Sequence, residues 1–186
     1  MRPSWTKIAI ILAVVWSVLG AAIWVVQRNK PTPARIVEFV NENPIEGKSG
    51  EDRSRVIEGV ASKVNKLTFE QRQDLGNNRR LDAFFKALTT AEKLHYLDLV
   101  LSKGFTQLNE ALNSMDPIKR RREIDKAVKQ LRENADQTIF AELDPEVLRK
   151  IVDQGLKAFY NDATIETKMD ALPFLEALEH QVRWNR

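Results

Sequence analysis

A long apolar run near the N-terminus, from Ile8 to Val26, contains 19 residues and no charged side chain. At about 1.5 Å per residue, a helix of this length spans roughly 28 Å, close to the thickness of the hydrocarbon core of a bilayer. Trp5 and Trp24 lie near its two ends, where amphipathic rings favour the membrane interface. The pattern predicts a single transmembrane helix with basic flanks within residues 1–30.

A cleaved signal peptide is the alternative interpretation of this segment. Gly20 and Ala22 could provide the small residues of a cleavage site. However, Ile23–Val26 continue the apolar run, and Arg28 and Lys30 then close it as a stop-transfer signal would. We therefore predict a retained signal-anchor in the cell membrane.

The orientation of this anchor is weakly specified, because basic residues flank it on both sides. Arg2 and Lys7 precede the run, and Arg28, Lys30 and Arg35 follow it, so the positive-inside rule nearly cancels. We prefer an N-terminus inside and a domain on the exported, periplasmic side, because a charged segment before the apolar run is typical of an export signal. The opposite orientation stays open.

Small residues recur every four positions within the predicted span, at Ala9, Ala13, Ser17 and Ala21. On a helix they form one stripe, and small side chains let helices approach closely in lipid, where apolarity alone drives no association. The stripe is a candidate packing surface for a second copy or for another transmembrane helix. The alternative is that it reflects only the frequency of alanine in membrane spans.

The rest of the chain, residues 31–186, shows apolar residues at helical rather than strand spacing. Helices are predicted over about 33–43, 51–67, 90–114, 117–135, 145–160 and 165–183, with a further start after Leu67. Thr89 and Glu92 fit a capping box, and Pro173 should kink or interrupt the last helix. We expect one all-α soluble domain of six or seven helices, forming a compact bundle or a short helical array.

Composition removes several functional classes. The net charge of +3 comes from the anchor, because residues 1–30 hold four basic and no acidic residues and the remainder has a net charge of −1. A domain made for nucleic acid would keep its positive charge without the anchor. The chain has no cysteine, so disulfides and thiolate metal sites are excluded. It also has no Gly-x-Ser-x-Gly turn and no glycine-rich phosphate loop.

A carboxylate-bridged metal pair in a helical bundle needs two Glu-x-x-His elements. Glu92 and His95 form one, but the other histidine, His180, follows Glu176 by four positions rather than three. We therefore predict no metal site, no cofactor and no catalytic residues. Two aromatic pairs, Phe84 with Phe85 and Phe159 with Tyr160, could line a groove for a peptide helix, although the preferred interpretation is that they fill the core.

Four consecutive cations, Lys119 to Arg122, are the most conspicuous charged feature. At 100° per residue, a continuous basic stripe opposite the apolar face is formed by Lys119, Arg122, Lys126 and Lys129. These four are a candidate site for an anion or a partner, and a solvated face with acidic neighbours is the preferred alternative. Arg120 falls on the apolar side, so we expect it to be partly covered and paired with a carboxylate or with carbonyls of a neighbouring helix end.

The C-terminal segment "DQGLKAFYNDATIETKMDALPFLEAL", Asp153 to Leu178, contains an "FYNDA" turn followed by "K-x-x-x-x-x-P". In these features the C-terminal half resembles uncharacterised membrane-anchored helical proteins of planctomycete-type bacteria. That resemblance implies a membrane-anchored helical protein but brings no activity and no functional residue.

The function predicted from the sequence is non-enzymatic: a membrane-tethered scaffold, adaptor or accessory subunit that binds another protein or forms a homo-oligomer. The alternative is a membrane-anchored module that binds an anionic ligand or lipid through the basic stripe. Nucleic acid is not an expected partner, because the domain is net negative and lacks a stacking platform.

Overall fold

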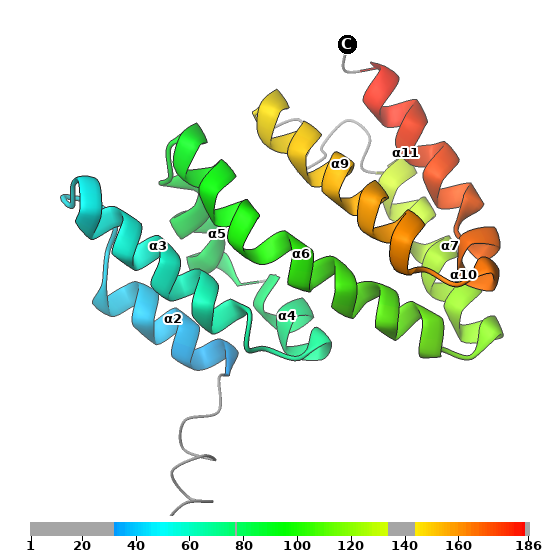
Figure 1. The fold of residues 1–186 in the computed structure, drawn as a ribbon, viewed down its shortest axis with the longest axis horizontal. Coiled ribbons are helices and arrows are strands. Elements are labelled where there is room, and N and C mark those ends of the chain that lie inside the picture. Colours follow the sequence, from blue (N-terminus) through cyan, green and yellow to red (C-terminus); the bar gives the residue numbers. More distant parts are fainter. Residues whose placement is uncertain (1–31, 77, 134–143, 185–186) are drawn as a thin grey trace, which may run out of the picture.

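The structure, a computed structural model, describes residues 32–76, 78–133 and 144–184, and within these residues it contains helices joined by turns and loops, with no strand. The helices are α2 (Pro33–Glu42), α3 (Gly50–Val64), α4 (Phe69–Gly76), α5 (Arg79–Lys86), α6 (Thr90–Ser114), α7 (Pro117–Glu133), α9 (Pro145–Asp162), α10 (Ile165–Asp170) and α11 (Leu172–Trp184). They form a compact bundle (Figure 1). The predicted all-α class is confirmed for this part of the chain.

The predicted number of helices was too low, since the described residues alone contain nine. Helix α5 was missed, although Asn78 caps it by accepting from the backbone N–H of Arg80 at 2.9 Å. The predicted break near Pro173 is confirmed, because the chain leaves helix at Ala171 between α10 and α11. Proline restricts the conformation of the residue before it and lacks a backbone N–H donor. The segment that was predicted as one helix over residues 165–183 therefore forms two.

Local capping explains why most helix starts could be located. Thr32 accepts from the backbone N–H of Arg35 at the start of α2. Thr89 and Glu92 form the predicted capping box at the start of α6, and Asp144 accepts from the N–H of Glu146 at the start of α9. Each cap satisfies a backbone donor that the first turn leaves free.

The larger hydrophobic core lies among α2 to α6 and the start of α9. Its most deeply buried side chains are Ile36, Ile45, Ile57, Val60, Leu67 and Val147. Arg53 ties its edge together, because it donates to both carboxylate oxygens of Glu92 at 2.6 and 2.7 Å and to the carbonyls of Ile45 and Ala87. One half-buried guanidinium thus joins α3, the loop before it and the turn between α5 and α6.

A smaller core lies between α7, α10 and α11, and buries Ile124, Val128, Leu131, Ala171 and Ala177. Helix α6 runs across the middle of the molecule, with α2–α5 towards one end and α7, α10 and α11 at the other (Figure 1). Helix α9 packs along α6, and at Gly155 the backbone approaches the ring of Phe105 so closely that an added Cβ would lie 3.0 Å from Cζ. Helices α6 and α9 therefore connect the two cores.

Within the described ranges, none of the helices combines the length and the apolar character needed to cross a membrane. The predicted span, Ile8–Val26, and the boundary between residues 1–30 and 31–186 lie outside the described residues. Both stay predictions.

Candidate functional site

The four cations of the predicted stripe all lie on α7 and all are exposed: Lys119, Arg122, Lys126 and Lys129. Two of them are already paired on their own helix, with Lys126 Nζ 2.8 Å from Glu123 and Lys129 Nζ 3.7 Å from Glu133. The hydrogen bond from Lys126, reinforced by Lys119 and Arg122, lowers the pKa of Glu123. Acidic neighbours thus offset much of the stripe's charge, as in an ordinary solvated helix face.

Arg120 is turned inward, and only 4 % of its surface is exposed. Its Nε and Nη2 each lie 2.8 Å from Asp170 Oδ2, and Nη1 donates more weakly to the carbonyls of Leu112 and Met115 at the end of α6. The prediction for Arg120 is confirmed: the side chain pairs with a carboxylate and also donates to carbonyls at the end of a neighbouring helix. Its burial is more complete than the partial cover that was expected.

Arg121 also contributes to this pairing, because its Nε lies 2.8 Å from the other oxygen of Asp170. The Asp170 side chain is 8 % exposed whereas that of Arg121 is 69 % exposed. Hydrogen bonds from Arg121 and then from Arg120 lower the pKa of Asp170. Half of the cationic run is therefore a structural clamp that holds α10 against α7.

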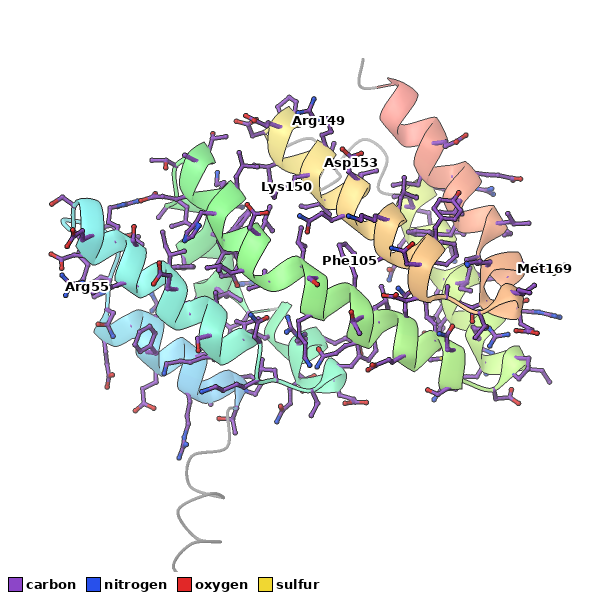
Figure 2. The ribbon with its side chains drawn as sticks, in the orientation of Figure 1. Arg55, Phe105, Arg149, Lys150, Asp153 and Met169 are labelled. Atoms are coloured by element: carbon purple, nitrogen blue, oxygen red, sulfur yellow. The ribbon has the colours of Figure 1, made fainter. Side chains whose placement is uncertain are left out.

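Exposed apolar side chains mark a different candidate site. Among the described residues, six large apolar side chains are exposed, and one of them, Leu99, lies on α6 away from the rest. The other five come from the start of α7, the end of α9, α10 and the start of α11: Ile118 (72 %), Tyr160 (61 %), Ile165 (73 %), Met169 (66 %) and Leu172 (53 %). We call these five residues the α10 surface. Figure 2 shows Met169 at one end of the molecule and Arg55 at the opposite end.

The α10 surface is built around a helical ridge. Ile165 and Met169 are four residues apart and share one side of α10, and the exposed Leu172 follows at the start of α11. Thr167 and Ala171 occupy the other side and are buried. The ridge therefore points away from the smaller core, and nothing in the described part of the chain covers it.

Contacts made by α10 hold the end of α9 and the start of α7, the two segments that carry the other two members. Lys168 Nζ donates to the carbonyl of Tyr160 at 2.8 Å, which holds the end of α9 beside α10. The Asp170 clamp holds the start of α7 against α10, and Ile118 is exposed in the first turn of α7. Apolar surfaces of a few hundred Å² on a monomer are often functional, since exposing them to water is unfavourable.

The one Glu-x-x-His element proves to be structural. Glu92 is held by Arg53 and accepts from the backbone N–H of Thr89, and the bond from Arg53 lowers its pKa to about 2. His95 is exposed and lies 3.8 Å from Glu58. No group of three or more histidine, aspartate or glutamate side chains in the described residues is placed to hold a metal ion. The side chain of His180 is not among the side chains that the structure describes.

The first aromatic pair fills the core, as preferred. Phe84 is buried, and both Phe84 and Phe85 pack edge-on against Tyr96, with ring centroids 6.2 and 6.0 Å apart. The two residues of the second pair have different surroundings: Phe159 packs against the smaller core, and Tyr160 is exposed on the α10 surface.

The sequence did not single out the ridge residues, although their spacing was visible in it. The opposite side of the same segment offers Thr167, Ala171 and Phe174, which are also small or apolar. Periodicity alone could not decide which side would be buried. The other candidate set, Ala9, Ala13, Ser17 and Ala21, lies outside the described residues.

Comparison of the chain with protein family models, with curated proteins and with solved structures finds no match in any of the three. The resemblance to membrane-anchored helical proteins of planctomycete-type bacteria therefore stays a prediction.

Proposed function

We propose that the chain is a non-enzymatic, membrane-tethered adaptor or scaffold that binds another protein through the α10 surface. The observation that carries this proposal is the gathering of five of the six exposed large apolar side chains at one end of the described molecule. Covering such side chains releases about 25 cal/mol for each Å² of apolar area. A protein partner can bury these side chains at a small cost in conformational entropy, because the folded domain already holds them in place.

The charges around the α10 surface favour a polypeptide partner over a lipid one. Lys119 and Arg122 are exposed on α7, whereas Glu166 and Glu176 are exposed on α10 and α11. An anionic bilayer would attract the first pair and repel the second. A protein can match both signs at once. The alternative function, binding of an anionic lipid or ligand by the basic stripe, is further weakened by the pairing of Lys126 and Lys129.

The non-enzymatic part of the proposal is supported by the roles of the perturbed carboxylates. Glu92, Asp144 and Asp170 all have lowered pKa values, and each has a structural partner that explains the shift: Arg53, Thr90, and the two arginines of α7. Perturbed groups with such partners are architectural rather than catalytic candidates. The predicted anchor would place the domain beside the membrane, on the exported side in the preferred orientation.

Crosslinking in native membranes followed by mass spectrometry tests the proposal. The full chain should recover a recurrent protein adduct, and Met169→Asp should reduce its recovery at least tenfold, because a carboxylate then lies in the middle of the apolar contact. Leu99→Asp is the matched control, since Leu99 is an exposed apolar residue outside the α10 surface. Equal recovery from the two variants would refute the proposed contact.

A further inference from the structure

We infer that α7, α10 and α11 open as one unit, while α9, which lies between α7 and α10 in the sequence, stays with α6. We call these three helices the small-core unit. Its opening is independent of what binds the α10 surface. Three features of the described residues point to it: the separation of the two cores, the place of α9, and the polar contacts that join the unit to the rest.

The small-core unit has a hydrophobic core of its own. Helix α7 packs against α10 and α11, and α10 packs against α11. Among the described residues, no buried member of this core comes from α6, and Phe159 is the one residue of α9 that packs against it. With five buried residues, against fifteen in the larger core, the small-core unit loses less apolar burial when it opens.

Helix α9 belongs with the larger core, despite its place in the sequence. Val147 is fully buried in that core, and Ile151 packs against it. Helix α9 also lies beside α6 and packs along it (Figure 1), and Lys150 Nζ lies 2.5 Å from a carboxylate oxygen of Asp98 on α6. The chain therefore passes from the larger core into the small-core unit at two connections, one at the end of α6 and one at the end of α9.

A single side chain bridges these two connections. Asn113, in the last turn of α6, donates from Nδ2 to the carbonyl of Asp162 at 2.9 Å and accepts from the backbone N–H of Thr164 at 3.0 Å. Of the three helices in the unit, α10 makes the main contact with α6. The bonds from Arg120 Nη1 to two carbonyls at the end of α6 are long, at 3.4 and 3.5 Å, and therefore weak. Asn113 thus forms the hinge between the unit and the rest of the molecule.

Opening of the small-core unit divides the α10 surface. Tyr160 lies at the end of α9 and stays in place, whereas the other four members of the surface lie on α7, α10 and α11 and move. In the closed state the two parts are held together by the hydrogen bond from Lys168 Nζ to the carbonyl of Tyr160. The five side chains therefore form one surface only when the unit is closed, and a molecule that covers all five stabilises the closed state.

Thiol labelling of single cysteines measures this opening, because the chain has no cysteine of its own. The full chain carries one cysteine at a buried position: Val128 on α7, Ala177 on α11, or Val100 on α6 in the larger core. These three residues are matched in exposure, at 8, 7 and 7 %. We expect Val128→Cys and Ala177→Cys to react with dithiobis(nitrobenzoic acid) at least tenfold faster than Val100→Cys, because the small-core unit opens without unfolding of the larger core.

Asn113→Ala tests the hinge in each of these three chains. It removes both bonds to the connection between α9 and α10, so it should speed labelling of the two small-core cysteines about tenfold and by the same factor. Labelling of Val100→Cys should not change. Asn65→Ala is the matched control, because Asn65 also donates to a carbonyl of α6, at 2.7 Å, but within the larger core. It should leave labelling of the small-core cysteines unchanged.

Equal labelling of all three cysteines would overturn the inference. So would unchanged labelling in the Asn113→Ala chain, or different factors for Val128→Cys and Ala177→Cys. Faster labelling of Val100→Cys in that chain would show that the two cores open together, which also contradicts it. Val147→Cys tests the place of α9: it should be labelled as slowly as Val100→Cys, and labelling as fast as that of Ala177→Cys would mean that α9 opens with the unit.

Discussion

Asp170 lies between two arginines of α7 and accepts from both, yet the two contacts differ in their surroundings. The side chain of Arg120 is 5 % exposed, and that of Arg121 is 69 % exposed. An exposed ion pair contributes little to stability, because water solvates both partners well. Removing one partner of a buried pair is costly, because the remaining charge loses its compensation.

Arg120→Met should therefore lower the melting temperature of the full chain by roughly 10 °C, because Asp170 and two carbonyls of α6 lose their donor. Arg121→Met should change it by less than about 2 °C. Circular dichroism at 222 nm during heating measures both. Similar losses in the two variants would mean that the Arg120–Asp170 pair contributes no more to stability than the exposed Arg121–Asp170 pair.

Glu92 makes stability depend on acid in a defined direction. Its folded pKa of about 2 lies below the ordinary value of 4.5, so the unfolded chain binds the proton more readily. Its contribution is complete above about pH 5 and is lost as the pH falls from there towards 2. The loss amounts to about 2–3 kcal/mol.

Glu92→Gln should be less stable than the wild type at pH 7, and the difference should shrink as the pH is lowered to 3. Urea unfolding at pH 7, 5 and 3 gives the free energy of unfolding of both chains. If the free energies of unfolding of the two chains changed equally with pH, the Arg53–Glu92 pair would not be the cause of the acid sensitivity.

At the scale of elements, two helical glycines differ in what surrounds them. A Cβ at Gly59 on α3 would lie 2.8 Å from Cζ of Phe39, so the ring of α2 packs directly on the backbone of α3. A Cβ at Gly104 on α6 would meet only a guanidinium nitrogen of Arg72, at 3.7 Å. Alanine favours the helix over glycine by about 0.5–1 kcal/mol wherever space allows.

Gly104→Ala should therefore raise the melting temperature by about 2–4 °C, and Gly59→Ala should lower it, because displacing Phe39 costs about 1–3 kcal/mol. Differential scanning calorimetry of the two variants measures both shifts. A rise in both would show that α2 does not rest on Gly59.

Helix starts could be predicted from the sequence because they depend on adjacent residues. Thr32, Thr89 and Asp144 each cap a helix whose start could be predicted from the neighbouring residues. The inward turn of Arg120 followed from helical geometry, and the break near Pro173 followed from the chemistry of proline. The α10 surface could not be predicted, because which side of Ile165–Leu172 is buried depends on how α7 and α11 pack against it.

At the scale of the whole molecule, the two cores differ in size. Among the described residues, fifteen buried residues form the core around α2–α6, and five form the core of α7, α10 and α11. Helix α10 is short, and the few helices that pack against it cover only one of its sides. The smaller core therefore ends in an exposed ridge, and we expect a partner protein to complete it.

A photo-crosslinking residue at position 160 would show whether a partner protein covers the α10 surface. Replacing Tyr160 by benzoylphenylalanine keeps an aromatic ring at a position that is 61 % exposed on the α10 surface, and the same residue at position 55 is the control. Irradiation of cells that produce the full chain should give an adduct of discrete mass from position 160 and none from position 55. No adduct from position 160, or the same adducts from both positions, would show that no partner protein binds the α10 surface.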